Sequence, residues 1–597
     1  MFKLLKYLKK CWYFALLAPI FMIAEVTMDM LVTNKMGTMI DIVNSYGPTS
    51  NNNQFLNTIV SNGIIMLALV LIGVVSGILS GVFANLASQK FANDLRKDLF
   101  SKIMHLSFQQ SDDFSTASLV TRVTNDVTAV QTMIAMAIRM FIRSLSMFIL
   151  GIVFTLQISK QFMIILAVAL PLEILIMVFF MIKAFPMFSI VQTKLDKVNS
   201  VVHENLTGAR VVKAFSKEDY EYNRFVEAND TLTSITLKVN KLMAIIMPLF
   251  MLIVYAGMIA IYYIGANSQF DAMLYLENFA TSIDPKISVG EMEKATTYIM
   301  MIMSSLLMIG MTFANMARAA ASGKRINEVL ETPDIICDGN LDVKTLKETG
   351  TIEFKNVDFA YPNASASVLE NINLKIEKGE TVAIVGATGS GKTTLVNLIT
   401  RFYDVTKGEI LVDGENIKNY KLVDLRNKIA IVLQKAELFA GTIKENIKWG
   451  NPNATDEEVE WAANIAQAIE FIDSKEKKFD EYVEEKGTSL SGGQRQRLSI
   501  ARAIVKKPEI LIFDDSTSAL DLVTEAKLYK AMRDNIADTT KIVVAQRIAT
   551  AKNADKIVVL DGGTIIAYDT HENLLANCEI YQDIYNSQLK REGDING

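Results

Sequence analysis

This chain of 597 residues has little cysteine and only a small net charge. The three cysteines, Cys11, Cys337 and Cys578, lie far apart and in no metal-binding spacing, so we expect reduced, unpaired thiols. The formal net charge of −5 is small and argues against nucleic acid as the main partner. The chain is instead rich in apolar residues. Half of its residues are hydrophobic and its mean hydropathy is positive, which is unusual for a soluble protein of this length.

The apolar residues gather before about residue 320, in stretches long enough to cross a bilayer as helices. Six such spans are predicted, at about 12–36, 59–86, 131–156, 162–185, 242–264 and 296–320. The segments between the second and third spans and between the fourth and fifth are long, polar and basic, which places them in the cytoplasm. The Asp41–Asn57 link has no Lys or Arg and should face outward. Met1–Lys10, with four lysines, suits a short helix at the cytoplasmic interface.

Both cytoplasmic segments are expected to be helical, so the membrane helices should continue well below the bilayer. Each segment breaks in its middle, at 111–115 and at 205–209, where short helices could dock onto a soluble domain.

Ionisable residues inside the predicted spans are costly and are therefore functional candidates. Glu25 and Asp29 share one helical face, as do Arg139 and Arg143, and Glu173 lies in the middle of its span. Two interpretations stay open: the acids and arginines pair with one another inside the bundle, or they line a polar substrate cavity. Spans five and six are rich in methionine, which suits either an adaptable binding surface or ordinary membrane packing.

The segment Thr381–Leu398 carries the strongest chemical signal in the chain. A β-rich run leads into Gly386-Ala387-Thr388-Gly389-Ser390-Gly391-Lys392-Thr393 and then into a helical pattern, which is G-x-x-x-x-G-K-[ST] in its proper context. Glycines let backbone N–H groups converge on an anion, and the helix N-terminus adds partial positive charge. Lys392 can reach the β- and γ-phosphates, and the Thr393 hydroxyl can bind Mg²⁺. The segment is predicted to bind a nucleoside triphosphate, and Thr394 is one of the binding residues.

Two further motifs follow in the soluble half. The run Pro508–Asp514 reads as a buried strand ending in an acid, as needed to hold the magnesium shell. Between it and the phosphate loop, Leu490-Ser491-Gly492-Gly493-Gln494 opens a helix, and its hydroxyl, glycine amides and helix N-terminus form a second anion site.

Over nearly its whole length the sequence resembles the ABC transporters of the exporter type, in which a membrane domain precedes the ATPase. The resemblance rests on the order and spacing of all these motifs together. It implies that Tyr361 stacks on adenine, that Gln434 senses magnesium, and that Ser518-Ala519-Leu520-Asp521 forms the loop after the catalytic strand. In the membrane half, Glu204-Asn205, Gly208, Arg210 and 212–215 resemble the family's second coupling region. The implied magnesium ligands are Thr393, Gln434 and Asp514.

The resemblance also implies a fold and a division of the chain. The fold class is an all-α six-helix transmembrane domain followed by an α/β P-loop ATPase domain with a helical subdomain. Residues 1–325 are assigned to the first, 326–345 to a linker and 346–597 to the nucleotide-binding domain. Family members dimerise head to tail, with each ATP held between one chain's phosphate loop and the other chain's LSGGQ.

The chain departs from the family at two catalytic positions. After Asp514 the family usually places Glu, the base that polarises water, and this chain has Asp515. Where the family has His, this chain has Gln546, which can hydrogen-bond a γ-phosphate but cannot carry a proton. Because two such changes fall in one site whose binding motifs are all kept, we predict weakened hydrolysis there rather than neutral drift.

The resulting hypothesis is one subunit of a heterodimeric exporter of small amphipathic or hydrophobic molecules, in the multidrug manner. It would be a multi-pass protein of the plasma (inner) membrane with a cytoplasmic ATPase domain, taking ATP and Mg²⁺. Two alternatives stay open: a homodimeric lipid or peptide exporter, and an ATP-gated channel, which would show ion currents without solute accumulation.

Overall fold

The structure is a computed structural model that describes residues 2–45, 52–279 and 287–595, apart from 344–345, 347–348, 363 and 365. It forms two compact units: Met1–Met104 with Ala117–Thr332, and His105–Thr116 with Pro333–Gly597. The domain boundaries at 325 and 345 remain predictions from the sequence. The middle of the Asp41–Asn57 link, residues 46–51, lies outside the described residues.

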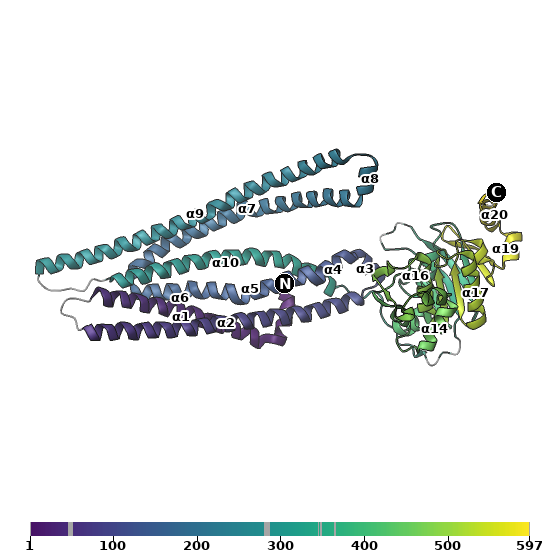
Figure 1. Cartoon of the computed structure of the whole chain (residues 1–597), viewed down its shortest axis with the longest axis horizontal. Helices are drawn as coiled ribbons and strands as arrows, with labels where there is room; N and C mark the ends of the chain where they lie inside the picture. The colour runs from purple at the N-terminus through teal and green to yellow at the C-terminus, as the bar shows by residue number, and fades with distance from the viewer. Residues whose placement is uncertain are drawn as a thin grey trace. The chain divides into compact units, whose positions relative to one another are not determined.

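The first unit is a bundle of long helices (Figure 1). Within the described residues, six helical segments are long and apolar enough to cross a membrane, as the sequence predicted. Five of them are α1 Trp12–Asn44, α2 Asn52–Met104, α7 Lys160–Thr207, α9 Glu218–Phe279 and α10 Val289–Leu330. The third span in chain order is built from α4 Thr116–Thr121, η2 Arg122–Asp126, α5 Val127–Met136, η3 Ala137–Phe141 and α6 Ile142–Ile158.

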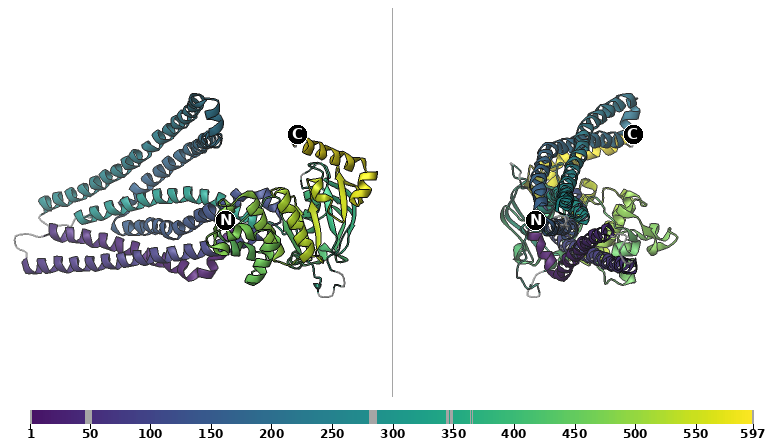
Figure 2. Two further views of the ribbon diagram at one scale, coloured as in Figure 1. Left: turned by 45° about the vertical axis from the view of Figure 1, so that its right-hand side comes forward. Right: turned by 90° about the vertical axis from the view of Figure 1, so that its left-hand side faces the viewer.

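The helices extend well past the membrane, as predicted. α9 is 62 residues long, which corresponds to roughly 90 Å at 1.5 Å per residue, against a hydrocarbon core of about 30 Å. α7 and α9 run side by side and diverge from the other helices toward the short helix α8, Ala209–Ala214, that joins them (Figures 1 and 2). The second break expected from the sequence therefore does form a short helix.

The N-terminal helix η1, Phe2–Cys11, packs on α2. Leu4 and Tyr7 are buried, and the Tyr7 ring meets Phe91 edge-on at 6.1 Å between centroids. Its lysines remain on the exposed side of the helix, and Lys3 pairs with Glu331 at 2.8 Å. None of the three cysteines is paired, as expected: Cys11 and Cys578 are buried and Cys337 is exposed.

The second unit is an α/β domain built on two main sheets. The larger sheet has six strands in the order β12-β11-β3-β10-β9-β6, and the smaller has four in the order β2-β1-β4-β5 within the described residues. In the larger sheet β3 pairs in parallel with β10 and β11, and β9 pairs in parallel with β10 and β6. The strands are β1 Ile352–Phe359, β2 Leu369–Ile376, β3 Thr381–Val385, β4 Lys407–Val412, β5 Glu415–Asn416, β6 Ile429–Val432, β9 Ile510–Asp514, β10 Thr540–Val544, β11 Lys556–Asp561 and β12 Thr564–Asp569.

Parallel strands buried on both faces need near-continuous apolar runs, which is what these strands carry. Every residue of β9 and β10 is buried, so the sheet forms the centre of the hydrophobic core. The carboxyl ends of β3, β6, β9 and β10 consequently lie along one edge, where ligands bind in open α/β sheets.

The helices of the second unit surround this sheet and form a separate subdomain. The two-stranded ribbon of β7 Gly441–Thr442 and β8 Tyr482–Val483 lies in the subdomain, with α13 to α16 around it. These helices are α13 Ile443–Lys448, α14 Asp456–Ile465, α15 Ile469–Asp473 and α16 Gly492–Ile504. Around the sheet lie α11 Lys392–Ile399, α12 Leu422–Lys428, α17 Leu522–Asn535, α18 Ile548–Ala551, α19 His571–Asn577 and α20 Glu579–Ile595.

The first cytoplasmic break forms α3, Phe108–Phe114, which belongs to the second unit. The Phe108 ring lies 4.2 Å from that of Phe402, and the Gln110 amide donates to the Pro333 carbonyl at 2.6 Å. The docking expected for a short helix at this break is therefore seen for α3.

Candidate nucleotide site

The phosphate loop runs from the end of β3 to the start of α11, and its glycines are required by the backbone. Gly386 has φ +155° and Gly391 has φ +100°, both in the region that L side chains rarely adopt. A Cβ on Gly386 would lie 2.0 Å from the Leu560 carbonyl oxygen, and one on Gly391 would lie 2.7 Å from the Leu369 side chain. The loop therefore approaches β2 and β11 as closely as a backbone can, while Thr388 and Gly389 stay exposed on its outer side.

Lys392 opens α11 and folds its side chain back over the loop. Its Nζ donates to the carbonyl of Gly386 at 2.9 Å and to that of Ala387 at 2.7 Å. Burial lowers the pKa of Lys392, and the nearby Asp515 and Asp514 oppose that effect. The ammonium is thus held over the concave side of the loop, where a phosphate would lie.

Thr393 and Asp514 meet across the loop and the sheet. The Thr393 hydroxyl donates to Asp514 Oδ1 at 2.9 Å, and Asp514 ends β9 with its carboxylate buried. Burial raises the pKa of Asp514, and the Thr393 hydrogen bond and Lys392 moderate the rise. Hydroxyl and carboxylate oxygens are the ligands that Mg²⁺ prefers.

Three residues from the ends of three different strands meet at the carboxylate of Asp515, which is itself one of them. Its backbone has φ +48°, and its buried carboxylate oxygen Oδ2 accepts from the Gln434 amide at 2.7 Å and also from the Gln546 amide. Gln434 follows β6, and Gln546 follows β10. Burial raises the pKa of Asp515, whereas the Gln434 hydrogen bond and the charge of Lys392 act in the opposite direction.

Tyr361 lies beside the loop within an aromatic cluster. Its hydroxyl is 3.0 Å from Thr394 Oγ1, and its ring meets Tyr403 edge-on at 5.3 Å and Phe359 at 4.9 Å. The sequence had singled out only Tyr361. The aromatic pair Phe402-Tyr403, which follows the phosphate-loop helix, was the available signal that more aromatic surface is gathered here.

The second anion motif caps α16. The Ser491 hydroxyl accepts from the Gln494 backbone N–H at 3.3 Å, and the Gln494 side chain accepts from the Ser491 N–H at 3.0 Å. Ser491 and Gly492 are exposed and Gly493 is partly exposed. Among the hydrogen bonds of the described residues, none joins this motif to the phosphate loop. The structure therefore presents the two anion sites separately.

These residues fit a magnesium-bound nucleoside triphosphate. Ser390 Oγ is buried in the loop and has no hydrogen-bond partner among the described residues. A bound ligand could supply that partner. The glycine cradle, the inward ammonium of Lys392 and the Thr393–Asp514 oxygens together match a triphosphate with a hard cation.

Comparison with known proteins identifies the family. Residues 15–306 match the family described as ABC transporter transmembrane region, and residues 369–518 match the family described as ABC transporter. An uncharacterized ABC transporter ATP-binding protein of Bacillus subtilis, YfiB, is 37% identical over 592 residues, which is 99% of either chain. The chain is an ABC transporter.

Other relatives of this transporter carry more specific names. An ATP-dependent lipid A-core flippase of Syntrophus aciditrophicus is 34% identical over 533 residues, or 88% of this chain and 86% of the flippase. A bacterial Atm1-family ABC exporter solved with ATP bound superposes with a TM-score of 0.76, covering 96% of this chain and 98% of its own at 24% identity. The transporter therefore has fused membrane and ATPase domains in an Atm1-type exporter fold, and its ATPase domain implies ATP hydrolysis coupled to transport.

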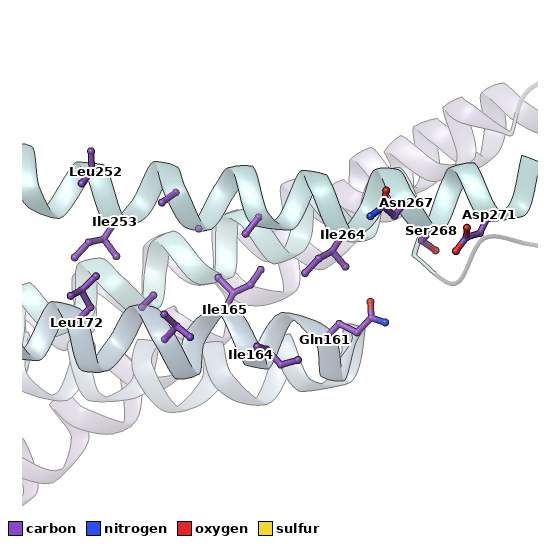
Figure 3. A pocket seen from close by; sticks show the side chains of 15 residues that line it. Gln161, Ile164, Ile165, Leu172, Leu252, Ile253, Ile264, Asn267, Ser268 and Asp271 are labelled. Atoms are coloured by element: carbon purple, nitrogen blue, oxygen red, sulfur yellow. The ribbon is translucent and has the colours of Figure 1, made fainter.

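The membrane unit of the transporter contains a large cavity between α7 and α9. Its volume is about 800 Å³. Figure 3 shows Gln161, Asn267, Ser268 and Asp271 gathered at one end, while apolar side chains such as Leu172 line the other. The cavity is amphipathic along its length.

The ionisable residues of the spans divide into two groups. Arg143 on α6 donates to Glu25 at 2.7 Å and lies 3.5 Å from Asp29, both on α1, so the pairing interpretation holds for these three residues. Glu173 on α7 behaves differently. Neither of its carboxylate oxygens has a hydrogen-bond partner among the described residues.

Proposed function

We propose that this chain is one half of a heterodimeric ABC exporter that moves small amphipathic or hydrophobic molecules out across the plasma membrane. Its ATPase domain would lie in the cytoplasm, and its own phosphate-loop site would bind ATP and hydrolyse it slowly. The observation that carries the proposal is the convergence of two carboxamides, Gln434 and Gln546, on the single carboxylate of Asp515.

The geometry explains why hydrolysis would be slow. A general base must come within about 2.6–3.2 Å of the proton it takes, and Asp is shorter than Glu by one C–C bond of about 1.5 Å. In addition, Oδ2 of Asp515 already accepts two amide hydrogen bonds, which hold the carboxylate back at the sheet edge. The amide of Gln546 can hydrogen-bond a phosphate but cannot relay a proton.

All the residues that are expected to bind nucleotide are present in this chain. Lys392 and the loop N–H groups would hold the phosphates, and Tyr361 would stack on the adenine ring. Thr393, Asp514 and Gln434 would hold Mg²⁺, which when bound neutralises charge on the phosphate oxygens. This site would therefore bind ATP even though its Asp515 is shorter than the usual Glu.

The intact signature of Ser491–Gln494 favours a heterodimer. In a head-to-tail dimer this motif would complete the site built on the other chain's phosphate loop. A homodimer would set a good signature opposite a poor base in both sites and leave none efficient. The simplest arrangement is a partner that supplies Glu and His to one competent site.

A second candidate is a homodimeric lipid exporter. Its support is the similarity to proteins named as lipid A-core flippases and the amphipathic cavity between α7 and α9.

The test compares single replacements in the co-purified complex. Replacing the partner's catalytic Glu by Gln should nearly abolish ATP hydrolysis, on the scale of the 10²–10⁴-fold effect of a general base, while Asp515→Asn should reduce it by no more than about twofold. Asp538→Asn, an exposed acid in the same domain, is the matched control. A homodimer of the purified chain with vigorous ATPase activity and solute transport would refute the heterodimer.

A further inference from the structure

Glu173 is a buried carboxylate near the middle of the predicted fourth span, 162–185. It lies about 20 Å along α7 from Lys160, which begins the helix, so it is near the middle of a hydrocarbon core of about 30 Å. Its exposed fraction is 3%, and neither oxygen has a hydrogen-bond partner among the described residues. Such a group inside a membrane protein points to a function.

The carboxylate lines a cavity of about 230 Å³ between α7, α9 and α10. Four methionines surround the cavity: Met177, Met181, Met243 and Met311. Phe180 and Phe250, both buried, add aromatic faces. Among the described residues that line it, none is Lys, Arg or His, and Glu173 is the one acid.

No positively charged side chain among the described residues that line the cavity therefore compensates the charge of Glu173. Glu25 and Asp29 show the contrast, because both pair with Arg143 inside the same bundle. An unpaired ionised carboxylate in apolar surroundings costs several kcal/mol, so it must meet a proton or a cation. A lining rich in methionine and phenylalanine suits a soft, bulky cation.

We propose that this cavity binds a lipophilic monovalent cation with an aromatic group, with Glu173 as the counter-ion. The inference rests on the proposed function in that it names the charge class of the transported molecules. Ring faces of Phe180 and Phe250 attract a cation that lacks N–H groups, and flexible thioethers adapt to different apolar shapes. Ile253 lines both this cavity and the larger amphipathic cavity between α7 and α9, so the two cavities adjoin.

The test uses two ligands of one shape, phenyltrimethylammonium and its neutral isostere tert-butylbenzene. The full transporter, purified with its partner in lipid nanodiscs, is labelled with ¹³C-methyl methionine, and each cavity signal is assigned by a Met→Leu replacement. Both ligands should shift the signals of Met177, Met181 and Met243, and the cation should bind more tightly. Equal or weaker binding of the cation by the wild-type protein would overturn the inference.

Replacement of the acid isolates the charge. Glu173→Gln keeps the shape of the side chain and should weaken cation binding by about 100-fold, and by at least 10-fold, while tert-butylbenzene binds as before. Asp196→Asn, an exposed acid further along the same helix, should leave both ligands unaffected. Unchanged cation affinity in Glu173→Gln would refute the role of the carboxylate.

A second variant keeps the carboxylate and supplies it with an internal partner. Met177→Lys places an ammonium one helical turn from Glu173, where it should pair with the acid and abolish cation binding. Retained cation binding would count against the inference even if Glu173→Gln failed to fold.

Transport separates this inference from the proposed function. In proteoliposomes with ATP, export of neutral amphiphiles without export of phenyltrimethylammonium would sink the cation site and leave the exporter proposal standing. Binding of the cation as described, with no ATP-dependent movement of any solute, would do the reverse.

Discussion

Asp515 is the position at which one methylene should matter most under the proposed function. Lys392 folds over the phosphate loop and Thr393 donates to Asp514, whereas the carboxylate of Asp515 accepts from the amides of both Gln434 and Gln546. Because a left-handed backbone at φ +48° sets the direction of the side chain, the missing length cannot be regained by a small shift of the chain.

Restoring the family's residues should therefore restore hydrolysis. Asp515→Glu combined with Gln546→His should raise ATP turnover at this site by about 10²–10⁴-fold, measured in a complex whose partner lacks its own base. The same pair with Lys392→Ala should lose the gain, because ATP binding is weakened. No increase in the double variant would show that something other than the base limits this site.

At the scale of elements, an ionic cluster joins segments from the two main sheets of the ATPase domain. Lys428, at the end of α12, pairs with Asp413 at 2.8 Å and with Glu509 at 2.6 Å, and the Asp413 side chain is 0% exposed. Burial alone would lower the pKa of Lys428, but the hydrogen bonds to both carboxylates raise it overall. The cluster links the segments after β4 and before β9.

Lys428→Met should destabilise the ATPase domain by about 3–5 kcal/mol, since it leaves two carboxylates facing each other without a cation. Fluorescence of Trp449 and Trp461 reports unfolding in a Trp12→Phe background, and Lys421→Met, at an exposed lysine, is the control. Because the folded pKa is raised, the contribution of Lys428 is complete below the ordinary lysine pKa of about 10.4 and is lost as pH rises through the folded value. The difference between wild type and Lys428→Met should shrink in that range, and a constant difference would contradict the assignment.

On the scale of the whole molecule, the long helices of the first unit alternate in direction, and α8 joins α7 to α9, which run side by side. With the ATPase domain in the cytoplasm, Asn52 at the start of α2 should face outward and Ser216, between α8 and α9, should face the cytoplasm.

Cysteine labelling checks this orientation. In a chain whose three native cysteines are replaced, Asn52→Cys should react with a membrane-impermeant maleimide in intact cells, and Ser216→Cys should react only after lysis. The reverse pattern would overturn the topology.

Much of the architecture follows from the sequence alone, because the signals are local. A helix that crosses lipid must be apolar along its own length, so the six spans can be recognised one by one. The phosphate loop and the signature are also contiguous, and their glycines and caps act within a few residues. The fold class and the family rest on such local patterns.

Only the tertiary structure decided which distant residues meet. Gln434, Asp515 and Gln546 share one site because parallel strands end at one edge, and α3 joins the second unit through Phe402. In the membrane, the sequence left five residues equally open to pairing: Glu25, Asp29, Arg139, Arg143 and Glu173. Helix packing brings Arg143 to the first two and leaves Glu173 in an apolar cavity, since the partner of a charge depends on the helix that faces it and not on its neighbours in the chain.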